Sequence, residues 1–234
     1  MDYTIRKSVR AKRMRLSMDS SGALTLVLPK FMPELAGRVF VQSQKKWIER
    51  QRSKVELKVE NYLQQEIVTG SSIFIFDQKY YSIKIEPTNL IRDSFKVDSE
   101  YLVLKLSTKN KKSKQLRIKV LIEKFYRQKA KDYLTEASFF WAQKLGASFN
   151  DVRIKSTKTR WGSCSSNKNL NYNWRIMQAP EAVVNYLVIH EVCHLKQMNH
   201  SARFWNLVES LDPNFKVHQK YLKDNQDRLL GFLS

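Results

Sequence analysis

The chain has 234 residues, 42% of them hydrophobic, and it carries 42 Lys and Arg against 22 Asp and Glu, a formal net charge of +20. This length is enough for one large domain or two small ones, each with a real core. No apolar run approaches the roughly 20 residues that cross a bilayer, and no apolar secretory segment follows Met1. Two cysteines, Cys164 and Cys193, are too few for a disulfide scaffold. We therefore expect a cytoplasmic protein with reduced thiols and no membrane partner.

The positive charge is concentrated in two stretches. Residues 1–50 carry +7 (11 basic minus 4 acidic) and residues 101–150 carry +9 (12 minus 3), whereas residues 51–100 carry −1 (7 minus 8). The densest run holds six basic residues: Lys109, Lys111, Lys112, Lys114, Arg117 and Lys119. Such a run is either an ordinary solvated surface or a surface that attracts a polyanion or an acidic protein. No nucleic-acid motif decides between these interpretations.

The N-terminal region is predicted to begin with two strands and a helix. The strands are residues 3–16 and 23–28, joined by a turn at Ser20-Ser21-Gly22, and the second ends at Pro29. A loose helical periodicity then predicts an amphipathic helix from about Pro33 to Lys54.

Three further runs rich in β-branched and aromatic residues are predicted strands: 72–76, 80–85 and 101–106. A hairpin turn at residues 77–79 joins the first two. The polar, lysine-rich segment 107–113 predicts a boundary between a β-rich region with one long helix, residues 1–114, and a second domain, residues 115–234.

The second region starts with a strongly periodic helix over residues 115–145, which Gly146 is suited to end. Residues 151–156 and 170–177 are predicted strands with a loop at 159–166, and the later strand offers an edge for an extended substrate. A mostly apolar helix follows from Pro180 to about Met198, with Asn199 reversing the chain. Two more helices are predicted, one capped by Ser201 and ended at Asp212-Pro213-Asn214, the other over residues 215–230. The whole chain is thus predicted as α+β, with a β-hairpin before the apolar helix.

That apolar helix carries the sequence His190-Glu191-Val192-Cys193-His194. Two histidines four residues apart lie on the same helix face, so both rings can reach one metal ion. Glu191 lies about 100° round the helix, close enough to take a proton from a water held by that ion. His200 follows after five residues, far enough for the chain to leave the helix and fold back. We predict a metal site formed by His190, His194 and His200.

Other readings of these residues stay open. Glu209 or His218 could supply the third ligand in place of His200, which would then lie at the start of the next helix. The histidines could also be ordinary core or surface residues without a metal.

Three protein ligands with one open position describe a catalytic zinc site, so we expect one Zn²⁺ per chain.

The predicted chemistry is peptide-bond hydrolysis. Zinc polarises a carbonyl and acidifies water, while Glu191 acts as general base and later delivers the proton to the leaving amine. The oxyanion needs a further donor, for which Arg160, Tyr172 and Tyr186 are candidates by residue type.

A set of motifs around the histidines resembles the YgjP-like metallopeptidase domain family and, more distantly, SprT-like zincins. The motifs are Arg160-Trp161-Gly162-Ser163-Cys164, Asn173-Trp174-Arg175, Ala179-Pro180, the His190–His194 motif, Asn199-His200-Ser201 and Phe204-Trp205. The resemblance is dense over residues 150–210 and looser toward the N-terminus. It implies a zincin-like catalytic core with His190, His194 and His200 as zinc ligands and Glu191 as general base. Trp161, Gly162 and Cys164 have a simpler reading as scaffold residues that pack and turn.

Two functions compete with a zinc peptidase acting on proteins or peptides. One is a nucleic-acid-associated protein whose zincin core is recruited to or regulated by DNA, with Lys111, Lys112 and Lys114 in the contact. The other is a metal-binding interaction module without catalysis. Oligomeric state has no signature in the sequence.

Overall fold

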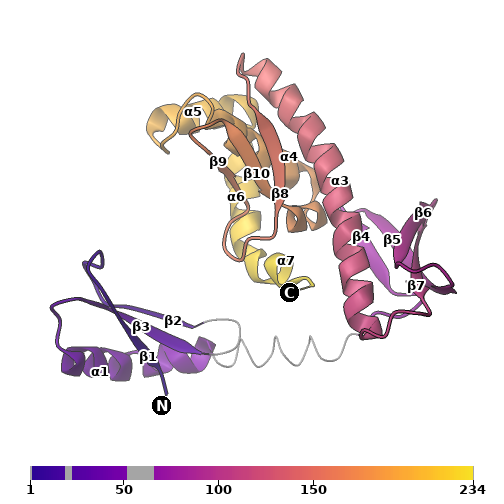
Figure 1. The fold of residues 1–234 in the computed structure, drawn as a ribbon. Coiled ribbons are helices and arrows are strands. Elements are labelled where there is room, and N and C mark those ends of the chain that lie inside the picture. Colours follow the sequence, from indigo (N-terminus) through magenta and orange to yellow (C-terminus); the bar gives the residue numbers. More distant parts are fainter. Residues whose placement is uncertain (1, 19–22, 52–65, 234) are drawn as a thin grey trace. The chain divides into compact units, whose positions relative to one another are not determined.

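The computed structural model describes residues 2–18, 23–51 and 66–233, and it confirms the α+β class (Figure 1). The chain divides into two compact units, residues 1–66 and 67–234, each with its own hydrophobic core. The boundary predicted near residue 114 falls inside the second unit. No described helix is long and apolar enough to span a bilayer.

The first unit is a three-stranded sheet with a helix on one face. Its strands are β1 (Thr4–Ser8), β2 (Arg15–Met18) and β3 (Leu24–Pro29), in the order β1-β3-β2, with β1 parallel and β2 antiparallel to β3. Helix α1 (Glu34–Ser43) covers the face formed by three buried leucines, Leu24, Leu26 and Leu28. Gly37 permits this close approach, because a Cβ there would lie 2.9 Å from a methyl group of Leu26.

The strands and the helix predicted for this unit are present, but their bounds differ from the predicted ones. The single strand predicted over residues 3–16 is two strands separated by residues 9–14, since β1 and β2 pair with opposite sides of β3. The helix predicted from Pro33 to Lys54 is interrupted at Gln44 and continues over residues 45–51. The predicted turn at Ser20-Ser21-Gly22 and the end of that helix lie outside the described residues.

The second unit begins with a four-stranded sheet in the order β4-β5-β7-β6. Its strands are β4 (Ser72–Ile75), β5 (Lys79–Thr88), β6 (Ser94–Asp98) and β7 (Tyr101–Ser107). The predicted hairpin turn between β4 and β5 is confirmed, with Phe76 and Asp77 in the left-handed region. Strand β6 was not predicted. The sheet packs on helix α3 (Lys114–Lys144), for example through the rings of Tyr81 and Phe125, whose centroids are 5.3 Å apart.

A largely buried ion pair joins this sheet to the start of α3. The Asp93 carboxylate accepts hydrogen bonds from Arg117 (2.6 and 2.9 Å), from the backbone N–H of Ser107 (2.8 Å) and from the Asn110 amide (3.1 Å). The hydrogen bonds from Arg117 are the main cause that lowers the pKa of Asp93 to about 2. One carboxylate therefore fixes the lysine-rich turn to both neighbouring elements.

We expect Asp93→Asn to lower the free energy of unfolding by about 1–3 kcal/mol at neutral pH, because Arg117 would lose its charged partner. A carboxylate with a lowered pKa stabilises the fold fully above its unfolded pKa and loses that effect as pH falls through about 2. The free energies of unfolding of the wild type and Asp93→Asn, measured with urea, should therefore differ clearly at pH 7 and differ less at pH 2.5. An undiminished difference at low pH would contradict the assigned charge interaction.

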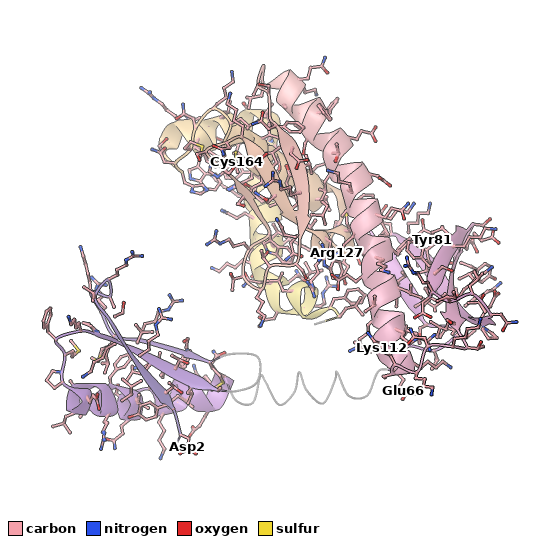
Figure 2. All side chains as sticks on the ribbon, in the orientation of Figure 1. Asp2, Glu66, Tyr81, Lys112, Arg127 and Cys164 are labelled. Atoms are coloured by element: carbon pink, nitrogen blue, oxygen red, sulfur yellow. The ribbon has the colours of Figure 1, made fainter. Side chains whose placement is uncertain are left out.

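The rest of the second unit is a small sheet covered by helices (Figures 1 and 2). Strands β8 (Asp151–Lys155), β9 (Gly162–Cys164) and β10 (Asn169–Asn173) have the order β8-β10-β9, with β8 parallel and β9 antiparallel to β10. A 3-10 helix η1 (Trp174–Gln178) leads to four helices: α4 (Glu181–Cys193), α5 (Ala202–Leu211), α6 (Phe215–Asp224) and α7 (Gln226–Gly231). Helix α3 packs against both β8 and α4.

Three sequence predictions for this part need correction. The loop predicted at residues 159–166 contains β9, and the strand predicted over 170–177 ends at Asn173, whose side chain accepts a hydrogen bond from Arg175 N–H and so starts η1. The last helix breaks at Asn225 into α6 and α7. Gly146 is confirmed as the residue that ends α3, since its φ is +58°.

Candidate metal centre

Helix α4 places the histidine motif deep in the core. Nine of its residues are buried: Val183, Val184, Tyr186, Leu187, Val188, Ile189, Glu191, Val192 and Cys193. An apolar surface all round is typical of a helix that is packed on several sides. The motif therefore lies on a helix held by its neighbours on several sides, with His190 partly buried and lining a cleft.

The helix ends at Cys193, earlier than the predicted Met198, and His194 is its C-terminal cap. The chain reverses through a turn in which the N–H groups of Lys196 and Gln197 donate to the carbonyl of Cys193. Asn199 lies in the bend that leads to His200, but it does not adopt the left-handed conformation expected of it. The turn has a further effect: His194 Nδ1 lies 3.0 Å from the Gln197 carbonyl, which leaves His194 Nε2 free to bind another atom.

The reversal brings three imidazoles together. One nitrogen from each of His190, His194 and His200 lies within 4.8 Å of the other two, so the three could hold a metal ion. The Nε2 atoms of His190 and His200 are 3.1 Å apart. In a tetrahedral site with zinc–nitrogen distances of about 2.0–2.1 Å, ligand nitrogens are about 3.3 Å apart. The spacing of this pair therefore suits a shared metal ion.

The environment favours the neutral form of His190 and His194, which metal binding requires. Burial, with smaller contributions from His194 and His200, lowers the pKa of His190 to about 3. Burial also lowers the pKa of His194. Glu191 Oε2, a buried atom beside the triad, has no hydrogen-bond partner among the described residues. Since buried polar atoms normally have partners, this carboxylate oxygen fits a site that holds a ligand.

Aromatic side chains from α5 hold two of the rings. The Phe204 ring stacks on His194 with centroids 4.5 Å apart, and the Trp205 ring stacks on His200 at 5.6 Å. Phe215 in turn stacks on Trp205 at 5.5 Å. Phe204-Trp205 is one of the motifs that carry the family resemblance, but the sequence assigned the pair no role beside the histidines. The signal that could have found this role is the position of Phe204 and Trp205, four and five residues after His200.

The neighbouring alternatives lie outside this cluster. His218 Nδ1 is 2.8 Å from the Asp212 carboxylate, and Glu209 is exposed on α5. Neither belongs to the metal-competent group found among the described residues. The geometry thus favours His200 over both as a third ligand.

Among the described residues, Glu191 is the only carboxylate that lines the cleft beside the triad. This cleft of about 350 Å³ also includes Arg160, Trp161, Tyr186 and Lys223 in its lining. Glu191 is 4% exposed, and burial raises its pKa to about 8. A nearby cation favours the ionised carboxylate and opposes this effect of burial.

The three candidate oxyanion donors are placed differently. Tyr172 is fully buried and shares a 3.0 Å hydrogen bond with Ser138, so its hydroxyl is already engaged. Tyr186 and Arg160 line the cleft with His190 and Glu191. The structure therefore narrows the candidates to these two residues.

Gly162, at the start of β9, lies directly against Glu191. A Cβ at this position would be 2.4 Å from Glu191 Oε1 and 2.7 Å from its carboxyl carbon. Sequence reasoning interpreted Gly162 as a turn residue. Its structural role is different, because the absence of a side chain there leaves space for the glutamate.

We expect Gly162→Ala to displace the Glu191 carboxylate, since contacts this short are not tolerated. A displacement of about 1 Å at a reacting group can cost about 100-fold in rate, so peptidase activity should fall by about that factor. Gly231→Ala is the matched control, because a Cβ there has no atom within 4 Å. Activity of both variants would be measured with metal content and melting temperature. An active Gly162→Ala protein would show that this contact does not set the Glu191 position.

Comparison with known proteins adds one match. The model of a family described as YgjP-like, metallopeptidase domain, matches residues 12–225. No curated protein and no solved structure matches the chain significantly.

Proposed function

Because the chain belongs to the YgjP-like metallopeptidase domain family, we propose that it is a zinc-dependent peptidase whose site is formed by His190, His194, His200 and Glu191. The observation that carries this proposal is the convergence of three imidazole nitrogens beside a buried carboxylate. Membership of the family accounts for the His190–His194 motif, and the local geometry suggests how the three histidines and Glu191 would act together.

The donor set favours zinc. Imidazole nitrogens suit zinc and other transition metals, whereas calcium and magnesium prefer oxygen ligands. Three protein ligands leave a position for water or substrate, as in catalytic zinc sites. When bound, zinc supplies a Lewis acid that polarises the scissile carbonyl and lowers the pKa of water.

Glu191 then has the role of general base. Its carboxylate accepts the proton of the attacking water and delivers it to the leaving amine. The absence of a side chain at Gly162 leaves room for this carboxylate, and the Gln197 carbonyl orients the His194 ring. Tyr186 or Arg160 would donate to the developing oxyanion from the wall of the cleft.

Strand β9 would align the substrate. The sequence suggested that residues 170–177 offer a pairing edge, but β10 lies between β8 and β9, so that expectation is wrong. The edge strand next to Glu191 is β9, which begins at Gly162. An extended peptide added to this edge would pass the candidate base.

The proposal is tested by incubating the zinc-loaded protein with a diverse peptide mixture and identifying products by mass spectrometry. Cleavage should stop on chelation and return when zinc is restored. Cleavage that persists after complete metal removal would contradict a metal-dependent reaction, and absence of cleavage by the zinc-loaded protein would contradict the proposed activity.

A second candidate function, nucleic-acid binding, is favoured by the first unit. Eleven Lys and Arg side chains within residues 2–18 and 23–51 are exposed, against three acidic residues there, Asp2, Glu34 and Glu49. The strand register puts Arg6, Val27 and Arg15 in one row on the sheet face opposite α1. Such a face is complementary to phosphate groups.

We expect the protein to bind a DNA oligonucleotide with an affinity that falls steeply as salt rises. Arg6→Gln combined with Arg15→Gln should reduce the salt slope by about 2, since each phosphate contact contributes about 1. Lys111→Gln combined with Lys112→Gln tests the lysine-rich turn in the same way. Fluorescence anisotropy over a salt series measures DNA binding by the wild type and by both double variants. A wild-type affinity that does not change with salt would contradict nucleic-acid binding.

A further inference from the structure

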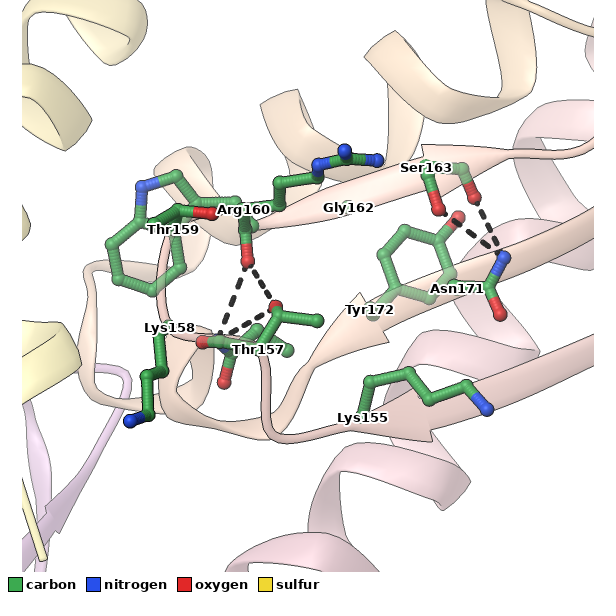
Figure 3. A pocket seen from close by; sticks show the side chains of 11 residues that line it. Lys155, Thr157, Lys158, Thr159, Arg160, Gly162, Ser163, Asn171 and Tyr172 are labelled. Carbon is green, nitrogen blue, oxygen red and sulfur yellow. Dashed lines mark hydrogen bonds between the residues drawn. The ribbon is translucent and has the colours of Figure 1, made fainter. Parts of the chain in front are cut away.

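A second hollow adjoins the catalytic cleft on the open face of the small sheet (Figure 3). Its volume is about 440 Å³. Its polar and charged lining residues include Lys155, Thr157, Lys158, Arg160, Ser163 and Asn171. Arg160, Trp161 and Gly162 line both this hollow and the cleft that contains Glu191, so one segment of chain separates the two.

The hollow has a polar wall because of the strand register. Asn171 is paired with Arg153 on β8 and with Ser163 on β9, and these three residues share the face opposite the buried Tyr172. The Asn171 amide donates to the Ser163 carbonyl at 3.1 Å. This face therefore presents hydrogen-bonding groups where the opposite face presents apolar ones.

Hydrogen bonds hold the loop between β8 and β9 in shape. The Asn173 amide donates to the Thr157 carbonyl at 2.8 Å, and the Thr157 hydroxyl donates to the Arg160 carbonyl at 2.6 Å. Figure 3 shows these bonds below Arg160, with Lys155 and Lys158 at opposite ends of the hollow. The positions of the cationic residues are thus set by the backbone around them.

The charged residues that line the hollow and the neighbouring cleft are mostly positive. Lys155, Lys158 and Arg160 are exposed, and none forms an ion pair with a carboxylate among the described residues. The cleft adds Lys223, and within the described parts of the chain Glu191 is the only acidic residue in either lining. By contrast, Arg153 on the same sheet face is paired with Asp151 at 3.0 Å.

We propose that this hollow is a subsite for an acidic side chain of the peptide substrate, so that the protein selects acidic peptides. The inference rests on the proposed peptidase function and adds a substrate class to it. An extended peptide on the β9 edge would pass from the cleft across Arg160 to the hollow. A carboxylate in the hollow would be attracted by the ammonium groups of Lys155 and Lys158, which lie at its two ends.

The test uses the full-length Glu191→Gln protein loaded with zinc, so that bound peptides are not cleaved. Its affinity for fluorescent peptides with amidated C-termini is measured by anisotropy, comparing Asp- and Glu-containing peptides with otherwise identical Asn- and Gln-containing ones. We expect the acidic peptides to bind more tightly. Adding Lys155→Gln and Lys158→Gln should weaken their binding roughly 3- to 10-fold, the range for two exposed ion pairs.

The charge-matched control adds Lys111→Gln and Lys112→Gln instead. Both lysines are exposed in the turn before α3. Figure 2 shows Lys112 well separated from Cys164, the last residue of β9. This control should leave peptide affinity unchanged. Equal losses in the two variants would indicate a general effect of net charge and would overturn the subsite.

Two further results would overturn the inference. They are equal binding of acidic and neutral peptides, and tighter binding of a single-stranded oligonucleotide that the Lys155 and Lys158 substitutions weaken. Cleavage assays on the wild type separate this inference from the proposed function. Cleavage without acidic preference contradicts the subsite alone, whereas acidic binding without any cleavage contradicts the peptidase and leaves the subsite supported.

Discussion

Glu191→Gln is expected to lower peptidase activity by about 10²–10⁴-fold while the protein keeps its metal. The amide fills nearly the same volume beside Gly162 but cannot accept a proton from water. The three imidazole nitrogens are unchanged, so metal content should stay near that of the wild type. Activity is measured on a cleaved peptide and metal by mass spectrometry of the purified protein.

Glu209→Gln is the matched control for that variant. It makes the same chemical change on an exposed residue of α5, outside the metal-competent group among the described residues. It should retain both activity and metal. An active Glu191→Gln protein would remove the general-base role, and metal loss in Glu209→Gln would instead point to Glu209 as a ligand.

His194→Ala is expected to abolish zinc binding and activity together. This substitution removes the central nitrogen donor and the ring that stacks on Phe204. Binding of a ligand to the folded state stabilises it by about 2.7 kcal/mol when the free ligand is 100 times its Kd. For a unit of this size, chelation should therefore lower the melting temperature of the wild type by about 5–10 °C.

Two controls make the metal experiment specific. The melting temperature of His194→Ala should not respond to a chelator, because no metal remains to be removed. His218→Ala should keep its zinc, since His218 is paired with Asp212 rather than with the triad. Zinc retained by His194→Ala, or lost by His218→Ala, would require a different set of ligands.

Sequence periodicity was most successful where a segment is long and packed on one or more faces. Helix α3 was predicted within a residue at each end, and the start of α4 at Pro180 was correct. Short elements were missed, such as β6 and β9, because three to five residues carry too little pattern to separate a strand from a loop. Helix ends also shifted, since the turn after Cys193 depends on local hydrogen bonds that periodicity does not encode.

The sequence by itself predicted the candidate site: two histidines on one helix face, a glutamate between them, a third histidine within chain reach, and a family resemblance that the family match confirms. These features are local, so spacing along one helix is enough to predict them. Only the tertiary structure decided which residues surround the glutamate. Gly162 meets Glu191 from a different element, Phe204 and Trp205 clamp the imidazoles, and β9 rather than β10 has the free edge. The reason is physical, because sheet order and burial arise from contacts between segments far apart in the chain.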